Sequence, residues 1–215
     1  MTQKHHYKLV YFDTKGRAEP IRLLFNYFDV DFEDVRLKKE EDYKNGSPFG
    51  QLPYLDVDRG KHVISQTSAI LRYVAKSFQA GFAGKTRIDA AKCDMFNDTF
   101  WDVLYAYWSE KLAPTPEMAE EMRMKWLQIR PEKLEIFQKY LRKNGGRYMV
   151  GDELTYTDLC FLYFLYVIQR GDGSGALDDF PLLTEYYNRI LRLPQITEYV
   201  LREWNIDEEK NRHSD

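Results

Sequence analysis

The sequence of 215 residues predicts an α/β domain followed by an all-helical domain. Two observations support this division. Short apolar runs alternate with one-sided helical patterns in the first part of the chain, whereas from Ile88 onward the apolar residues keep a period of 3.6. Between the two parts, Gly81-Phe82-Ala83-Gly84 is a natural linker. We expect an α/β domain at 1–80, a linker at 81–87, a helical domain at 88–205 and a polar tail at 206–215.

Composition excludes several classes of protein. Hydrophobic residues make up 44% and charged residues 30%, which suits a chain with a buried core and a charged surface. A net charge of −3 speaks against a nucleic-acid or anionic-membrane partner. The polar residues 1–8 lack the apolar run of a signal peptide, and no apolar run approaches the length of a membrane span. Cys93 and Cys160 form no CxxC pair, which argues against a disulfide scaffold. We therefore expect a cytoplasmic protein.

The first elements form a βαβ unit. Tyr7–Phe12 is an expected strand, Gly16 marks a turn, and a helix follows with Pro20 in its first turn. The helix is indicated by apolar residues at i, i+3, i+4 and i+7, namely Ile21, Leu24, Phe25 and Phe28. The next strand, 32–37, implies a right-handed crossover between parallel strands.

The rest of this domain is predicted to be a hairpin and a helix. Residues 38–47 are charged and end in a turn signal, Asn45-Gly46. Strands at 54–57 and 62–64 flank the turn at 58–60 and should be antiparallel, and a helix runs from about Gln66 to Phe78. The order βαβ, loop, ββα is the thioredoxin-like arrangement.

The second half is predicted to be helical throughout. Pro131 predicts a kink or a break into two helices. Thr155 and Asp158 form a capping box before a helix with a wide apolar face, which suggests a central buried helix. A glycine-rich stretch at 171–175 ends that helix, and two shorter helices follow.

Two polar side chains follow the first strand at the carboxyl end of the expected sheet, where open α/β folds bind ligands. They are the phenol of Tyr11 and the guanidinium of Arg17, and both can donate hydrogen bonds to an anion.

Four motifs resemble those of the cytosolic glutathione S-transferases, most closely the sigma class, which includes the haematopoietic prostaglandin D synthase type. The motifs are residues 7–12, Gly16-Arg17-Ala18-Glu19, Pro48-Phe49-Gly50-Gln51-Leu52-Pro53 and Gln66-Thr67-Ser68-Ala69-Ile70. Each motif alone is weakly specific, but their order and spacing together are strongly so. The resemblance covers nearly the whole chain, including Gly151-Asp152 and the segment 154–159.

The resemblance implies that Tyr11 stabilises the thiolate of bound glutathione and that Arg17 adds a second positive contribution. A free thiol has a pKa of about 8.5, and the thiolate is the nucleophile. Lowering that pKa by ~2 units requires roughly 2.7 kcal/mol, within reach of a charge-assisted hydrogen bond in a dry site. The alternatives are a packed strand aromatic for Tyr11 and a surface ion pair, for example with Glu19, for Arg17. Phe12 is expected to point to the opposite face, into the core.

The resemblance also implies the remaining glutathione contacts. In the family, the proline at Pro53 follows a cis bond that leaves the backbone of Leu52 free to pair with the cysteinyl part of glutathione, and Gln51 supports the same region. Gln66 and Thr67 lie at a predicted helix N-terminus that suits the γ-glutamyl carboxylate. The family usually has serine at Thr67. The alternative is ordinary helix capping by Ser65 or Thr67.

Two departures from the family matter. Its tryptophan and lysine for the glycine end of glutathione fall in Glu41–Asn45, which is two residues shorter here, so Tyr43 and Lys44 are the best substitutes. A solvated loop is the alternative. Related prostaglandin synthases build a metal site from acidic residues near Asp98 and Asp102, but Trp101 occupies one such position, so we expect no metal. Asp102 is expected to reach the partner's glutathione across a homodimer interface, or else to lie on a solvated face.

An aromatic cluster on the same predicted helix comprises Trp101, Tyr105, Tyr107 and Trp108. Such stripes are often core. We expect a mixture, with Tyr105 and Trp108 joining Thr14 around a pocket for a small hydrophobic electrophile.

The leading interpretation is a glutathione transferase that conjugates electrophiles in detoxification. The first alternative is a glutathione-dependent prostaglandin isomerase or lipid peroxidase, and the second is a crystallin-like or ligand-carrying relative without activity. A thiol–disulfide oxidoreductase is disfavoured because Tyr11 stands near the position that would carry its cysteine.

Overall fold

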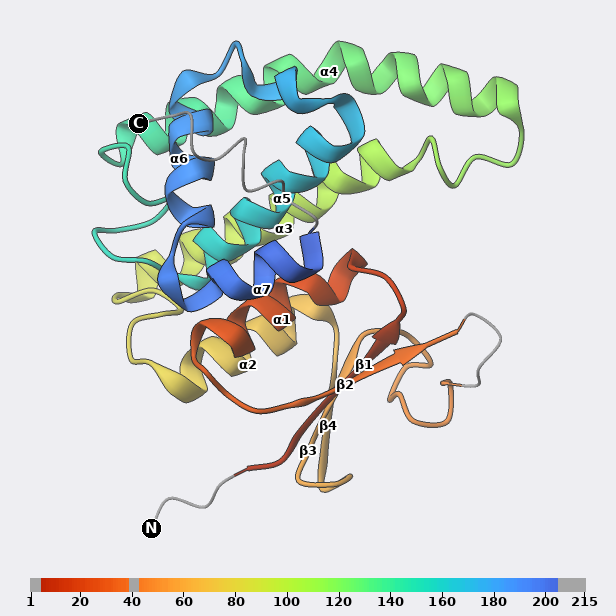
Figure 1. The fold of residues 1–215 in the computed structure, drawn as a ribbon, viewed down its shortest axis with the longest axis vertical. Helices are drawn as coiled ribbons and strands as arrows, with labels where there is room; N and C mark the ends of the chain where they lie inside the picture. The colour runs from red at the N-terminus through yellow and green to blue at the C-terminus, as the bar shows by residue number, and fades with distance from the viewer. Residues whose placement is uncertain (1–4, 39–42, 205–215) are drawn as a thin grey trace. The chain divides into compact units, whose positions relative to one another are not determined.

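The computed structural model describes residues 5–38 and 43–204, and the predicted polar tail lies outside this range. The contacts among these residues divide them into two units. One contains the chain up to Ala80 together with the residues from Leu191 onward, and the other spans Gly81–Ile190. Figure 1 traces both.

A four-stranded mixed sheet forms the centre of the first unit. Its strands are β1 (Tyr7–Phe12), β2 (Glu33–Leu37), β3 (Tyr54–Val57) and β4 (His62–Ser65), in the order β2-β1-β3-β4. β1 pairs in parallel with β2, and β3 is antiparallel to both β1 and β4. This confirms the predicted thioredoxin-like βαβ-ββα arrangement.

Two helices follow the strands as predicted, α1 (Glu19–Tyr27) and α2 (Thr67–Phe78). A 3₁₀ turn, η1 (Gly16–Ala18), joins β1 to α1. The core between helices and sheet is aromatic and aliphatic: Phe25 packs on Tyr7 with ring centroids 5.4 Å apart and stacks on Phe32 at 4.6 Å.

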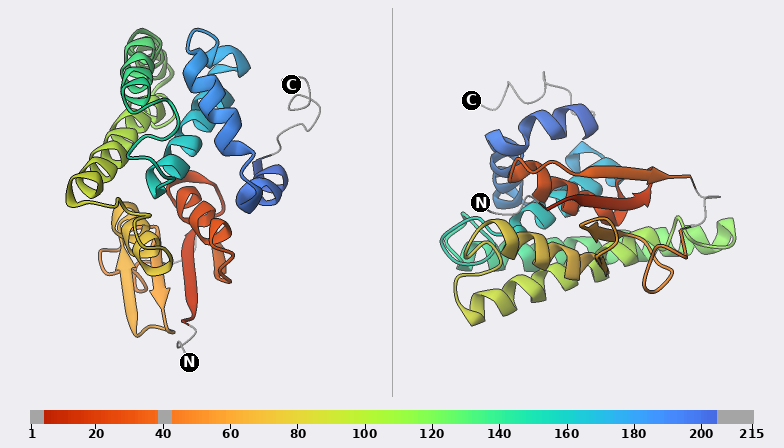
Figure 2. Two further views of the ribbon diagram at one scale, coloured as in Figure 1. Left: turned by 90° about the vertical axis from the view of Figure 1, so that its left-hand side faces the viewer. Right: turned by 90° about the horizontal axis from the view of Figure 1, so that it is seen from below.

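The last helix, α7 (Pro194–Trp204), belongs by its contacts to this first unit. It packs against α1, and the two lie side by side in Figures 1 and 2. Sequence periodicity gave no sign of this, because an amphipathic helix does not reveal which surface covers its apolar face.

The second unit is helical, with α3 (Arg87–Trp108), α4 (Pro116–Lys143), α5 (Tyr156–Asp172), η2 (Ser174–Leu177) and α6 (Pro181–Leu191). As predicted, α5 is largely buried; Phe161 stacks on Phe100 of α3 at 4.8 Å. Of the two outcomes predicted at Pro131, the break into two helices is not seen, since α4 is a single helix through it, and the kink stays a prediction. Pro131 and Leu127 are both exposed, so the carbonyl that loses its helical donor can bond to water.

The predicted capping box at the start of α5 is confirmed. Asp158 accepts hydrogen bonds from the backbone N–H of Thr155 and of Met149, both at 2.8 Å, and from the hydroxyl of Tyr186 at 2.7 Å. This buried carboxylate therefore ties the loop before α5 to α6. Cys93 and Cys160 are buried free thiols. Among the described residues, none of the helices has the length and apolar character needed to span a bilayer.

Candidate active site

The turn after β1 packs directly against the phenol of Tyr11. The backbone N–H of Arg17 donates a hydrogen bond to the Tyr11 hydroxyl oxygen at 3.2 Å. Gly16 has φ +44°, and a Cβ at this position would lie 2.6 Å from the same oxygen. Only glycine fits here without displacement. Among the described residues, no hydrogen bond has the Tyr11 O–H as its donor, so the phenol is held through its acceptor side.

Arg17 stands beside this phenol and is half-buried. Burial lowers the pKa of its guanidinium, and the Coulombic interaction with Tyr11 opposes that shift. Arginine remains protonated at neutral pH because its ordinary pKa lies far above neutrality. The side chain therefore brings a partly desolvated positive charge to the site.

A cavity of about 280 Å³ lies next to this turn, near the lower end of the usual size of ligand sites. Its walls come from η1, the loop before β3 and the start of α2. They are formed by Arg17, Tyr43, Gly50, Gln51, Leu52, Pro53, Gln66 and Thr67. The structure thus brings together most of the residues predicted to bind glutathione, from segments far apart in the sequence.

The loop before β3 is held by Ser47. Its hydroxyl donates to the Gln51 carbonyl at 2.6 Å and accepts from the Gln51 N–H at 3.1 Å, and it lies 3.3 Å from the Ser65 hydroxyl. The Leu52–Pro53 peptide bond is cis. Sequence analysis treated Ser47 only as part of a turn. Its position four residues before Gln51 is the one feature of the sequence that could have indicated a hydrogen bond between them.

The start of α2 has the features of an anion site. Thr67 is buried, lines the cavity, and its hydroxyl has no hydrogen-bond partner among the described residues. Gln66, the residue before the helix, makes no side-chain cap hydrogen bond, and the hydroxyl of Thr67 bonds to no described residue, so capping by Thr67 is not seen. The first N–H groups of a helix need partners from outside it and favour negative charge.

Gln66, which precedes α2, adopts the left-handed region with φ 74°. Non-glycine residues pay of the order of 1–3 kcal/mol for such a conformation and keep it where the surroundings impose it. Its amide donates to the Gln51 side chain at 2.9 Å, which links two walls of the cavity.

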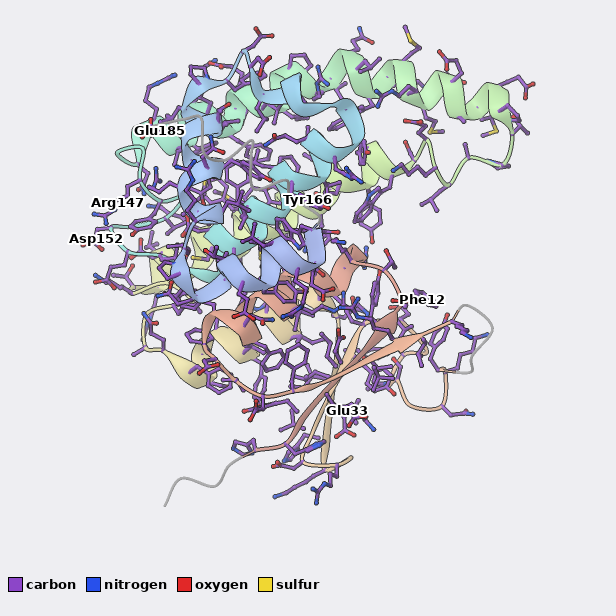
Figure 3. All side chains as sticks on the ribbon, in the orientation of Figure 1. Phe12, Glu33, Arg147, Asp152, Tyr166 and Glu185 are labelled. Carbon is purple, nitrogen blue, oxygen red and sulfur yellow. The ribbon has the colours of Figure 1, made fainter. Side chains whose placement is uncertain are left out.

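Tyr43 lines the cavity, and its ring is positioned by contact with the end of β1. Its ring packs edge-on against Phe12 with centroids 5.5 Å apart, and Figure 3 marks Phe12 at this end of the strand. Phe12 is half-buried, so its prediction as a core residue is only partly correct. Lys44 is exposed and is not among the residues that line the cavity. Glu41 and Asp42 lie outside the described residues.

The predicted residues of the helical unit lie on α3. Asp98 and Asp102 are exposed. Trp101 and Tyr107 are buried, whereas Tyr105 is 44% exposed and contacts Trp108 edge-on at 6.4 Å. Trp101 and Tyr107 are therefore core residues. Thr14 is exposed but belongs to the other unit, so a pocket shared with Tyr105 and Trp108 stays a prediction.

No metal centre is evident in residues 5–38 and 43–204, where no three His, Cys, Asp or Glu side chains are grouped to hold an ion.

Sequence analysis also missed Arg22, which lies fully buried behind the Tyr11 turn. Glu19, considered as a partner for Arg17, is buried and pairs with Arg22 at 3.2 Å.

Comparison with known proteins agrees with this geometry. Residues 7–76 match the glutathione S-transferase N-terminal domain and residues 101–203 the C-terminal domain. Glutathione S-transferase 1 of Ascaris suum is 35% identical over 90% of this chain and 95% of its own length. The structure of the monomeric Na-GST-3 from Necator americanus has a TM-score of 0.80 at 31% identity, covering 92% of this chain and 97% of that one. The structure of the prostaglandin synthase D of Nilaparvata lugens has a TM-score of 0.83 at 28% identity, and the match covers 92% of this chain and 98% of that one. The chain belongs to the glutathione S-transferase family and is a glutathione transferase.

Proposed function

We propose that Tyr11 holds the sulfur of bound glutathione as a thiolate by donating its phenolic hydrogen bond to it. The observation that carries this proposal is the fixed phenol, which accepts from the Arg17 N–H while its own proton is used by no described residue. A hydroxyl that accepts one hydrogen bond becomes a stronger donor of another. Arg17 adds a positive charge that favours the anionic sulfur over the neutral thiol.

Glutathione is proposed to fill the cavity beside this turn. The γ-glutamyl carboxylate would bind the start of α2, where the Thr67 hydroxyl has no partner among the described residues and the helix N-terminus favours negative charge, with Gln66 beside it. The backbone of Leu52, before Pro53, would pair with the cysteinyl part, and Gln51 would hold that loop. Tyr43 and Lys44 would meet the glycine end.

The thiolate then attacks an electrophilic carbon and forms a thioether. In a substitution the bond from that carbon to its leaving group breaks and the group departs with the bonding electrons, and in an addition the carbanion formed takes up a proton from solvent. Holding the two reactants together supplies much of the rate enhancement, and no metal is required. Thr14, Tyr105 and Trp108 are proposed to bind the hydrophobic electrophile. Conjugation of this kind would serve detoxification in the cytoplasm.

We further propose a homodimer of the sigma class, in which Asp102 reaches the partner's glutathione. Exposed apolar side chains support an interface: Phe49, on the loop that carries Gln51, is 71% exposed, and Met95 and Tyr140 of the helical unit are 44% and 46% exposed. One similar protein is described as monomeric, so sedimentation at several concentrations is the appropriate check.

A second candidate function is glutathione-dependent isomerisation of a prostaglandin or reduction of a lipid peroxide by the same thiolate. The similarity to a protein described as a prostaglandin synthase D supports this second candidate function. Product analysis with a prostaglandin endoperoxide distinguishes isomerisation from conjugation.

Binding to glutathione agarose and conjugation of a chromogenic aryl halide test the proposal. We expect both binding and turnover, and loss of turnover with retained binding for Tyr11→Phe. Binding without turnover in the wild type would favour the ligand-carrying alternative, and absence of binding would contradict the proposed site.

A further inference from the structure

A buried ionic network lies behind the turn that holds Tyr11. Arg22 of α1 is fully buried, and its Nη1 donates to the carbonyls of Thr14 at 3.0 Å and Lys15 at 3.3 Å. The same nitrogen pairs with Glu19, which is 1% exposed. Buried charges require partners of this quality, because each unsatisfied one is strongly unfavourable.

The helix α7 completes this network from a distant part of the sequence. Glu19 accepts hydrogen bonds from the Tyr199 hydroxyl at 3.0 Å and from the Trp204 indole N–H. Both side chains come from α7, which lies against α1 in Figure 2. The Glu19 carboxylate is therefore shared between Arg22 and two donors of the last helix.

A second, more exposed branch reaches the same helix. Arg22 donates its Nε to Asp34 of β2, Asp34 accepts from Arg36 at 2.8 Å, and Arg36 donates to Glu203 at 3.0 Å. Arg36 and Glu203 are 33% and 24% exposed, so water and salt weaken this branch. The branch through Glu19 is buried and therefore screened less by water and salt.

The network ends at the atoms that fix the phenol. Thr14 and Lys15 immediately precede Gly16 and Arg17, whose backbone packs against and hydrogen-bonds to Tyr11. Arg22 therefore anchors the start of the turn whose end positions the phenol. Any shift of Arg22 toward or away from Glu19 changes its bonds to these two carbonyls.

We infer that α7, through Tyr199 and Trp204, is a positioning element for the thiolate site. The two donors hold the Glu19 carboxylate, which holds Arg22 and so the turn against Tyr11. Neither residue touches the cavity that we assign to glutathione. This inference rests on the proposed role of Tyr11 and assigns a catalytic influence to a helix outside the predicted site.

Tyr199→Phe and Trp204→Phe test the inference in the full-length protein, because each removes one donor to Glu19 and keeps an aromatic ring. The readout is the pKa of bound glutathione, followed by thiolate absorbance against pH, together with the glutathione dissociation constant. We expect the bound thiol pKa to rise by about 0.5 to 1 unit and kcat/KM near neutral pH to fall about three- to tenfold, since small displacements of catalytic groups are costly. Glutathione affinity should change little.

Tyr156→Phe is the matched control. Tyr156 is also buried, and its hydroxyl donates to Asp94 at 2.7 Å in the helical unit. It should lower the melting temperature without moving the thiol pKa. Glu203→Gln, in the exposed branch, should move the thiol pKa less than Tyr199→Phe does. If one of the two test variants fails to fold, the other provides the measurement.

An unchanged thiol pKa in folded Tyr199→Phe or Trp204→Phe overturns the inference, whatever the change in melting temperature. This outcome is distinct from failure of the proposed function. If the wild type does not ionise bound glutathione, or Tyr11→Phe leaves its pKa unchanged, the role of Tyr11 itself fails.

Discussion

The backbone N–H of Arg17 donates to the phenolic oxygen of Tyr11 at 3.2 Å, so the short turn that carries Arg17 also holds the phenol of the proposed thiolate site. The hydrogen bond uses the oxygen as acceptor, which directs the phenolic proton elsewhere. Because this contact is made by backbone, it depends on the conformation of the turn and not on the Arg17 side chain.

Gly16→Ala should disrupt this turn. Its Cβ would lie 2.6 Å from the Tyr11 hydroxyl oxygen at φ +44°, so the phenol must move. We expect kcat/KM to fall about 10²-fold with a smaller effect on glutathione affinity. Gly60→Ala is the control, because Gly60 also has positive φ but no atom within 4 Å of an added Cβ. Equal loss of activity in both variants would contradict the steric argument.

Thr67→Val should weaken glutathione binding without destabilising the free protein. The Thr67 hydroxyl is buried with no described partner, so the free protein loses no hydrogen bond while the complex does. We expect about tenfold weaker binding by calorimetry, which corresponds to about 1.4 kcal/mol. Thr184→Val removes a hydroxyl bonded to the Leu177 carbonyl at 3.0 Å and should show the reverse pattern. Unchanged affinity in Thr67→Val would remove this hydroxyl from the site.

Arg17→Gln should raise the pKa of bound glutathione, because a positive charge near the sulfur favours the thiolate. We expect a shift of about one unit, at the low end of the effect of a nearby opposite charge. Arg17→Lys should recover part of it. Arg59→Gln, which removes an exposed arginine from the β3–β4 turn, is the control. A bound thiol with the same pKa in wild type and Arg17→Gln would show that this charge does not act on the sulfur.

Asp172→Asn should destabilise the helical unit in a pH-dependent way. Burial alone would raise the pKa of Asp172, but hydrogen bonds from Trp126, Arg123 and Arg130 outweigh burial and lower it. Since the folded pKa lies below the unfolded value of about 3.9, this stabilisation is present above about pH 4 and is lost as the pH falls through the folded pKa.

We expect Asp172→Asn to lower the unfolding free energy by about 2 kcal/mol at pH 7, as for loss of hydrogen bonds to a charged group. Denaturant unfolding of both proteins between pH 7 and about pH 3 provides the measurement. The difference should narrow below about pH 4. A difference that stays constant, or grows, toward low pH would contradict the assigned pKa shift.

Much of the fold could be predicted from local sequence signals. The strands, α1, α2 and the capping box of α5 depend on periodicity, turn residues and side-chain reach within a few positions. Most of the proposed glutathione residues were found through motifs that keep their spacing. The break at Pro131 did not occur, and its position exposed to water allows the carbonyl that loses its helical donor to bond to solvent.

Arg22 and Ser47 were missed for a different reason, because their roles depend on contacts that form only in the folded chain. Arg22 lies within an apolar helical pattern, where a single arginine is normally assigned to the exposed face. Its burial depends on Glu19, on Asp34 and on donors from Tyr199 and Trp204, about 180 residues further along the chain than Glu19. Ser47 likewise gains its role only when the loop before β3 closes. Such long-range polar contacts produce no periodic pattern of residues in the sequence.

The most direct test of the account is a pH titration of the thiolate absorbance of bound glutathione in the wild type and in Tyr11→Phe. We predict ionisation near or below neutral pH in the wild type and an upward shift of ~2 units in the variant, equivalent to roughly 2.7 kcal/mol. Superimposable titration curves, with glutathione bound in both proteins, would contradict the central role of Tyr11.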